Sequence, residues 1–541
     1  MCGIVGVLGS HEVAPVILDA LKRLEYRGYD SAGIATIHEG ALERRRATGK
    51  LINLQDLLVR EPLRGFAGIG HTRWATHGAP SVENAHPHRS GAVAVVHNGI
   101  IENFRELRDE LIAAGVKFTS ETDTETIVHL THKHLADGMS PVAAAHATLG
   151  RLEGAFALAF LFEGEEDLLI AARRGSPLVI GHGEGEMYVG SDAIALAPLT
   201  DKLTYLEEGD WAAITRSTVQ VFDANGGQVD RPVAAIAVES ATVDKSGHRH
   251  FMAKEMAEQP SIIQKALAAY TNEAGGTLSL PEGVQFNDIR RVVMVACGTA
   301  FYACQVAKYW FEQIARIPVE IDIASEFRYR DPVLERDDLL IVVSQSGETA
   351  DTLAALRHVA GHVRRTLAVV NVPTSSIARD ADVVMPILAG PEIGVASTKA
   401  FTAQLLSLLL LAAKAGLDRG KLNVDDFNAL MSEIRTVPGL MSQALDRAQD
   451  YVRVAEKLSE SDDVLFLGRG AMYPMALEAA LKLKEISYIH AEAYAAGELK
   501  HGPIALIDKT LPVVILAPKD VLFEKTISNM QEVMARHGQV T

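Results

Sequence analysis

The sequence of 541 residues has few cysteines, no excess of positive charge and no long uninterrupted apolar run. Three cysteines are too few for a disulfide framework in a chain of this length, which indicates a reducing compartment and predicts a cytoplasmic protein. Lys and Arg number 52 against 69 Asp and Glu, and the net charge of −17 repels a phosphate backbone, so nucleic acid is not expected as a partner. The longest apolar stretch lies between Lys399 and Lys414. It is shorter than the about 20 residues of a membrane span, so we expect a buried helix and no membrane association.

The composition itself is that of an ordinary globular protein. Hydrophobic residues make up 48% and charged residues 22%, and the length corresponds to about three domains of usual size. The first residues, MCGIVGVLGSHE, lack a basic region and their apolar run ends at His11, so they do not match a signal peptide.

The first part of the chain, residues 2–238, is dominated by short strand-like runs. Runs at 2–8, 92–97, 155–162 and 211–215 predict strands, and 13–24 and 103–114 predict helices. Because strands predominate without regular strand–helix alternation, we predict an α+β domain with packed antiparallel sheets. A polar stretch without apolar periodicity, residues 239–250, is expected to be a linker.

After the linker, apolar strands alternate with small-residue turns and helices. Strand, turn and helix follow one another from Arg291 and again from Leu339, and the same rhythm restarts at Asp463. This predicts two α/β doubly wound lobes with parallel sheets, one at 251–430 and one at 451–541. The second lobe is expected to be incomplete, since the chain contains fewer strands after the equivalent point.

A cysteine at position 2 becomes an N-terminal residue when Met1 is removed. Its α-amino group, with a pKa near 8, can then serve as the base for its own thiol. A lone Cys2 is more often a small buried residue, and the neighbouring motifs change that balance. Arg73 can bind a carboxylate, Asp123 can bind an α-ammonium group, and Asn98 with the Gly99 N–H can hold an oxyanion.

These residues resemble the class II glutamine amidotransferase domain of the N-terminal-nucleophile (Ntn) hydrolases. The resemblance covers CGIVG, LEYRGYDSAG, HTRWATHG, HNGIIEN and SETDTE. It implies that Cys2 attacks the side-chain amide of glutamine and that Asn98 and Gly99 form the oxyanion hole. It also implies a gate for ammonia at Trp74 and a glutamine site made by Arg73, Trp74, Thr76, His77 and Asp123.

The histidines of this region have a simpler interpretation. His77, His86 and His88, each taken singly, are more often hydrogen-bonded loop residues than chemical groups. His129 and His132 share a face of a predicted helix without a cysteine or carboxylate at metal-ligand spacing, so no metal site is predicted.

Hydroxyl residues mark a second candidate site where a parallel strand ends. Ser344, Ser346 and Thr349 lie between a predicted strand and helix, where free N–H groups attract an anion. Helix capping alone is an equally frequent role for such residues. A P-loop is absent and Gly468-x-Gly470 lacks the third glycine of a dinucleotide fingerprint, so no nucleotide, NAD or other cofactor is predicted.

Three charged residues, Glu478, Lys482 and Glu485, fall on one face of the long helix that begins near Met472. Such a stripe is usually solvated. Small apolar residues flank it, however, and ionisable residues crowd the following segment, HAEAYAAGELKHGP, which favours proton transfer next to a carbonyl.

Residues from about 250 onward resemble the tandem sugar isomerase (SIS) domains of the glutamine:fructose-6-phosphate aminotransferase (isomerising) family. ACGT, ASEFRYR, SQSGETADT, EIGVASTKAFTAQ and LGRG carry the resemblance together with the segment from ALKLKEISYIH to KHGP. It implies that Glu485 carries a proton between C1 and C2, supported by Lys482 and Glu478. It also implies that His501 of a neighbouring subunit opens the sugar ring, hence a homodimer. The implied sugar phosphate site comprises Cys297, Gly298, Thr299, Ser344, Gln345, Ser346, Thr349, Val395, Ser397 and Glu478.

The resemblance implies an enzyme that aminates and isomerises fructose 6-phosphate to glucosamine 6-phosphate, with glutamine as the nitrogen donor and ammonia led through an internal passage. Other glutamine-dependent transferases need a phosphoribosyl loop or an ATP motif, and neither is present. A sugar-phosphate-binding regulator or a glutaminase without amination stays as an alternative for two reasons. Ala300 replaces the family's usual serine, and the Arg-Asn-Leu-Ala-Lys-Ser run of the family's tail is not found in these 541 residues.

Overall fold

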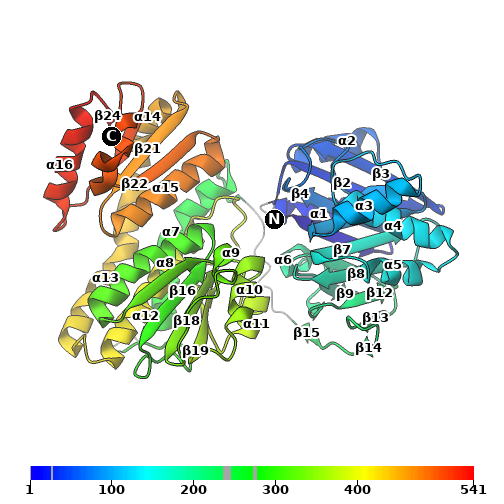
Figure 1. Ribbon diagram of the computed structural model, residues 1–541, viewed down its shortest axis with the longest axis horizontal. Coiled ribbons are helices and arrows are strands. Elements are labelled where there is room, and N and C mark those ends of the chain that lie inside the picture. The colour runs from blue at the N-terminus through cyan, green and yellow to red at the C-terminus, as the bar shows by residue number, and fades with distance from the viewer. Residues whose placement is uncertain (1, 26–27, 236–244, 272–276) are drawn as a thin grey trace. The chain divides into compact units, whose positions relative to one another are not determined.

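The computed structural model describes residues 2–25, 28–235, 245–271 and 277–541 (Figure 1). The chain divides into two compact units, Met1–Asp244 and Lys245–Thr541. Of the predicted linker, residues 239–244 lie outside the described residues, and residues 245–250 contain neither helix nor strand.

The first unit contains two antiparallel sheets. The eight-stranded sheet has the order β15-β11-β9-β10-β1-β4-β2-β3 and the seven-stranded sheet the order β14-β13-β12-β8-β7-β6-β5. The eight strands of the first sheet, in that order, are Val233–Ala235, Lys202–Tyr205, Val179–His182, Met187–Gly190, Gly3–Leu8, Ala67–Arg73, Ser31–His38 and Ala41–Thr48. The seven strands of the second are Gln228–Val229, Val219–Phe222, Trp211–Ile214, Leu169–Arg174, Gly154–Phe162, Val93–Ile101 and His88–Ser90.

Helices cover the outer faces of these sheets. They are α1 (Val13–Lys22), α2 (Leu51–Arg60), α3 (Phe104–Ala113), α4 (Thr124–Ala136), α5 (Pro141–Leu149) and the short α6 (Ala193–Leu196). One core lies between the sheets and includes Ile4, Ile69 and Val96; two further cores lie under α1 and α2 and under α4 and α5. The predicted α+β fold with packed antiparallel sheets is confirmed as a four-layer arrangement.

The first lobe of the second unit is a five-stranded parallel sheet of order β17-β16-β18-β19-β20. Its strands are Val319–Ile323, Arg291–Ala296, Asp338–Ser344, Arg365–Val370 and Val383–Pro386. The helices are α7 (Phe251–Tyr270), α8 (Gly298–Trp310) with a π-helical extension (Phe311–Ala315), α9 (Ala324–Phe327), α10 (Ala350–His358), α11 (Ser376–Asp380), α12 (Lys399–Asp418) and α13 (Val424–Asp446). The next helix, α14 (Ala448–Ser459), belongs to the second lobe, where its Leu458 packs against the core (Figure 1). Alternate residues of β16 and β18 enter cores on opposite faces, which makes the lobe doubly wound as predicted.

The second lobe repeats this plan with four parallel strands in the order β22-β21-β23-β24. The strands are β21 (Asp463–Gly468), β22 (His490–Ala495), β23 (Pro512–Ile515) and β24 (Gln539–Val540), and the helices are α15 (Met472–Ser487), α16 (Phe523–Met534) and the 3₁₀ turns η3 (Ala496–His501) and η4 (Pro503–Leu506). Helix α15 lies along β21 and β22 (Figure 1). The sequence pattern predicts neither the edge strands β17 and β22 nor β24.

Helix α12 is the described helix that is long and apolar enough to cross a membrane by length and composition. Of its most apolar window, 72% is buried inside the protein. Leu408, Leu410 and Leu411 pack in the core of the first lobe, so the prediction of a buried helix is confirmed.

Candidate active sites

Strand pairing places Cys2 at one end of the first sheet. β1 pairs antiparallel with β4, with Gly3 opposite Thr72, so Cys2 lies beside the segment that follows β4. Its Sγ accepts a hydrogen bond from the Trp74 N–H at 3.3 Å and lies 3.5 Å from the Trp74 carbonyl. Burial raises the pKa of the Cys2 thiol, so a thiolate forms here only when a base takes the proton.

The second sheet contributes Asn98 and Gly99, both on β6. The Asn98 side-chain NH₂ donates to the Cys2 carbonyl at 2.9 Å. Gly99 has φ +126°, and a Cβ there would lie 2.0 Å from the Ala155 carbonyl oxygen, so only glycine fits. The structure therefore brings Asn98 against Cys2, as an oxyanion site next to a nucleophile requires.

Arg73 is buried and holds the turn that follows it. Its guanidinium donates to the carbonyls of His77, Gly78 at 2.9 Å and Ala79 at 3.4 Å. Some of the Arg73 N–H groups that were expected to bind a substrate carboxylate therefore already donate to main-chain carbonyls. A substrate carboxylate would have to share the guanidinium with these carbonyls.

The other predicted glutamine-site residues surround this turn. Asp123 is buried immediately before α4, and its carboxylate accepts the Ile101 N–H at 2.9 Å. Trp74 is 39% exposed and packs edge-on against Tyr29, while His77 packs edge-on against Phe104. Thr76 is exposed.

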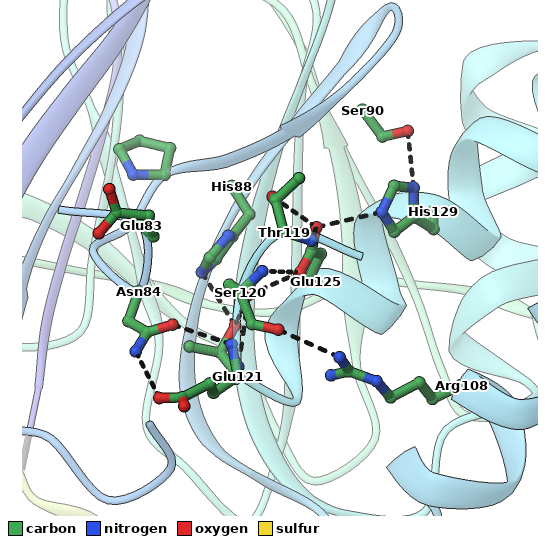
Figure 2. A network of polar contacts seen from close by, with 12 residues as sticks. Glu83, Asn84, His88, Ser90, Arg108, Thr119, Ser120, Glu121, Glu125 and His129 are labelled. Atoms are coloured by element: carbon green, nitrogen blue, oxygen red, sulfur yellow. Dashed lines mark hydrogen bonds and ion pairs between the residues drawn. The ribbon is translucent and has the colours of Figure 1, made fainter. Parts of the chain in front are cut away.

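A buried polar network that sequence reasoning missed fixes the segment around Asp123 (Figure 2). Glu125 is 4% exposed and accepts hydrogen bonds from Thr119, Ser120 and His129. Burial alone would raise the pKa of Glu125, but these hydrogen bonds hold it well below its usual range. Only the SETDTE motif hinted at the network, because its partners come from separate parts of the chain.

In the same network, Asn84 joins this segment to the turn that Arg73 holds. Its side chain donates to Glu121 at 3.1 Å and accepts the Glu121 N–H (Figure 2). It also donates to the Ala79 carbonyl at 3.0 Å. The predicted glutamine-binding residues therefore sit on two segments that are hydrogen-bonded to each other.

In the second unit, the loop between β18 and α10 brings several side-chain hydroxyls close together. Ser344 Oγ accepts the Gly347 N–H at 3.0 Å and lies 3.0 Å from Thr349 Oγ1, while Ser346 Oγ accepts the Glu348 N–H at 3.1 Å. Gly347 has φ +66°, and a Cβ there would lie 1.9 Å from Ser375 Oγ. This close-packed turn at the carboxyl end of a parallel strand is suited to hold a phosphate.

Neighbouring strand ends complete this edge of the sheet. Cys297 follows β16 and receives a long contact, 4.0 Å, from Thr352 on α10. The Gln345 carbonyl accepts the Asn371 N–H just beyond β19. Gly298 and Thr299 begin α8, and Ala300, in its first turn, is buried in the core of the lobe.

Two buried carboxylates that sequence reasoning missed shape the loop carrying Val395 and Ser397. Glu392 accepts Ser397 Oγ at 2.9 Å and the N–H groups of the next turn, and burial raises its pKa. Glu255 of α7 accepts the N–H groups of Ile393 and Gly394. Val395 is left 43% exposed at the tip of the loop.

The predicted charged stripe of α15 is a contact between the two lobes and not a solvated surface. Lys482 Nζ lies 3.4 Å from Glu478 and 2.5 Å from Glu485, and it donates to Thr299 Oγ1 of α8 at 3.0 Å. Thr299 donates in turn to Glu478 at 3.2 Å. This links Glu485 to the start of α8 at the carboxyl edge of the first sheet. His501, exposed at the end of η3, makes no hydrogen bond or ion pair with Lys482 or Glu485 among the described residues.

The pKa of Glu478 predicts a specific pH dependence of stability. Burial raises this pKa to about 7, against the opposing charge of Lys482. Because the folded state then binds a proton that the unfolded state releases, stability is full below about pH 4.5 and falls as the pH rises through 7. A shift of this size corresponds to a loss of about 3 kcal/mol.

The variant Glu478→Gln keeps a hydrogen-bond acceptor but does not titrate. We expect the free energy of unfolding of wild type, relative to this variant, to fall between pH 4.5 and 7.5 in urea titrations. If the free energy of unfolding changed with pH equally in the two proteins, a buried Glu478 with a raised pKa would be contradicted.

Among the described residues, no group of three or more His, Cys, Asp or Glu side chains is placed to hold a metal ion.

Comparison with known proteins finds a family match in each unit of the chain. The glutamine amidotransferase domain family matches residues 71–198, and the SIS domain family matches residues 285–414 and 457–541. A solved structure described as the C-terminal domain of glucosamine-fructose-6-phosphate aminotransferase from Francisella tularensis is 43% identical, with a TM-score of 0.54, over 55% of this chain and 84% of that one.

Curated relatives match the whole chain. A protein of Bradyrhizobium diazoefficiens named glutamine–fructose-6-phosphate aminotransferase (isomerizing) is 59% identical over 542 residues, which are 100% of this chain and 89% of that protein. A protein of the same name from Brucella abortus is 58% identical with the same coverage. The chain therefore belongs to the glutamine–fructose-6-phosphate aminotransferase (isomerizing) family.

Proposed function

We propose that this chain transfers the amide nitrogen of glutamine to fructose 6-phosphate and isomerises the product to glucosamine 6-phosphate, releasing glutamate. The observation that carries the proposal is the presence, in one chain, of Cys2 against Asn98 and of the cluster Thr299, Glu478, Lys482 and Glu485. The first arrangement suits attack on an amide, and the second suits proton transfer beside a bound sugar phosphate.

In the first half reaction, Cys2 Sγ attacks the side-chain amide carbon of glutamine, and its proton passes to the α-amino group exposed by removal of Met1. Asn98 and the Gly99 N–H stabilise the oxyanion, ammonia leaves with that proton, and water hydrolyses the thioester to glutamate. Arg73 and Asp123 hold the α-carboxylate and α-ammonium of glutamine, with Thr76 and His77 beside them and Trp74 controlling the exit of ammonia.

In the second half reaction, the phosphate lies in the loop Ser344–Thr349 and the sugar hydroxyls face Cys297, Thr299 and the loop of Val395 and Ser397. Ammonia condenses with the C2 carbonyl and water leaves. Glu485 then takes a proton from C1 and returns one to C2, while Lys482, itself paired with Glu478, holds the Glu485 carboxylate in place. His501 of a second subunit assists ring opening, so the active form is at least a homodimer. The proposed division is residues 2–238 for glutamine, a linker at 239–250, and sugar isomerase lobes at 251–430 and 451–541.

The proposal is tested by measuring the two products separately. With glutamine and fructose 6-phosphate, the 541-residue chain is expected to form glutamate and glucosamine 6-phosphate in equal amounts, and with ammonium in place of glutamine, the amino sugar alone. Glutamate from glutamine, with no amino sugar under either condition, would limit the chain to the first half reaction. Binding of fructose 6-phosphate with neither product would support a regulatory protein and overturn the proposal.

A further inference from the structure

Four buried histidines lie directly behind the proposed oxyanion hole. His71 lies near the end of β4, and His97 precedes Asn98 on β6. His86 lies on the loop before β5, and His88 is the first residue of β5. The rings of His71 and His86 stack at 4.2 Å, and His88 and His97 lie 4.9 and 6.5 Å from His86. Burial lowers the pKa of all four, and that of His71 to about 3, so the cluster is neutral at physiological pH.

His71 is the member of this cluster that contacts Asn98. Its Nε2 lies 3.0 Å from the His97 carbonyl oxygen and 3.0 Å from Asn98 Oδ1. Its Nδ1 is buried and has no hydrogen-bond partner among the described residues.

These distances determine which nitrogen of His71 carries the proton. A backbone carbonyl can only accept a hydrogen bond, so Nε2 must donate, and the neutral ring then leaves Nδ1 unprotonated. The same argument applies to the Asn98 amide. The Cys2 carbonyl, 2.9 Å away, can only accept, so the NH₂ group faces Cys2 and the oxygen faces His71.

We propose that His71 is a positioning residue for glutamine hydrolysis, whose Nε2–H holds the Asn98 amide with its NH₂ group toward Cys2. This inference rests on the proposed function, in which Asn98 is an oxyanion donor. One hydrogen of the NH₂ group goes to the Cys2 carbonyl, and the other has no partner among the described residues and is free for the oxyanion. A flipped amide would instead turn the lone pairs of Oδ1 toward the developing negative charge.

The stabilising effect of His71 therefore appears only as the oxyanion forms. Glutamine binding uses other groups in this proposal, so loss of the Nε2–H is expected to lower kcat and to change KM little. Because His71 is neutral, its donor is present at every pH at which the enzyme works, and it adds no step of its own to the pH profile near neutrality.

The test compares His71→Leu, which removes the donor, with His71→Gln, whose amide N–H can reach a similar position. We expect His71→Leu to lower kcat for glutamate release about 10²-fold, with KM within about threefold, and His71→Gln to stay within about fivefold of wild type. His88→Leu is the matched control. This variant removes a buried histidine that contacts Thr122 and not Asn98. Its loss of kcat is expected to be about tenfold smaller than that of His71→Leu.

A double-mutant cycle with Asn98→Ala decides whether His71 acts through Asn98. In the Asn98→Ala background, His71→Leu is expected to change kcat by less than about threefold, because the amide it orients is gone. If His71→Leu still lowered kcat about 10²-fold in that background, the inference would be overturned. The same follows if His71→Gln has the low kcat of His71→Leu although it unfolds like wild type. Glutaminase activity that survives Cys2→Ala would instead sink the proposed function itself, so the two failures are distinguishable.

Discussion

Replacing Cys2 by alanine is expected to lower glutamine hydrolysis by at least about 10⁴-fold in kcat/KM, because the attacking sulfur is removed and no other side chain can form the thioester. Alanine is also small enough after Met1 for the initiator to be removed, so the new N-terminus keeps its α-amino group. The measurement is glutamate release with and without fructose 6-phosphate.

Synthesis from ammonium provides the internal control for this variant. With ammonium as the nitrogen donor, Cys2→Ala is expected to form glucosamine 6-phosphate within about threefold of the wild-type rate, because the second half reaction uses groups of the other unit. Cys304→Ala removes a thiol buried in the core of the first lobe and is expected to keep both activities. Persistent glutaminase activity in Cys2→Ala would exclude Cys2 as the nucleophile.

The fold could be predicted from the sequence wherever an element is apolar on both faces. β16 and β18 are buried along most of their length and are evident as continuous apolar runs. β17 and β22 were not predictable in this way, because both are partly exposed edge strands, VEIDI and HAEAYA, with acidic or small residues between the apolar ones. Each follows the helix that comes after the first strand of its lobe, and each pairs with that strand, so the repeat of the lobes, more than local propensity, accounts for them.

For the sites, the sequence predicts which residues lie at strand ends, but not which hydrogen-bond partners fix the positions of their side chains. Cys2, Arg73 and Asn98 could be singled out because motifs surround them. His71 could not, since its contact with Asn98 depends on strands far apart in the chain. Glu125 bonds to nearby residues, but the network around it reaches His88 and Ser90, which lie far from it in the sequence, through Thr122 and His129. The same holds for α15, where periodicity puts Glu478 and Lys482 on one face. The small apolar residues beside it argue against a solvated stripe, and the contact with Thr299 of α8 shows what this face packs against.

Glu485→Gln is expected to lower glucosamine 6-phosphate formation by about 10³-fold with either nitrogen donor, because the amide cannot carry the proton between C1 and C2. The side chain is nearly isosteric and can still contact Lys482, from which the Glu485 carboxylate now lies 2.5 Å away. Fructose 6-phosphate binding, measured by calorimetry, is therefore expected to change less than about fivefold. Unchanged synthesis would exclude Glu485 as the proton carrier, and lost binding would reassign it to holding the sugar.

The same variant tests the proposal that His501 acts across subunits. Glu485→Gln and His501→Asn are each expected to be nearly inactive alone. After mixing and exchange of subunits, half of the dimers are hybrids, and each hybrid has one site with both native residues, so about a quarter of the wild-type activity returns. If His501 served the site of its own subunit, every hybrid site would carry one substitution and mixing would restore nothing. The recovered activity therefore separates a shared active site from two independent ones, in a measurement where each inactive parent protein is the control for the other.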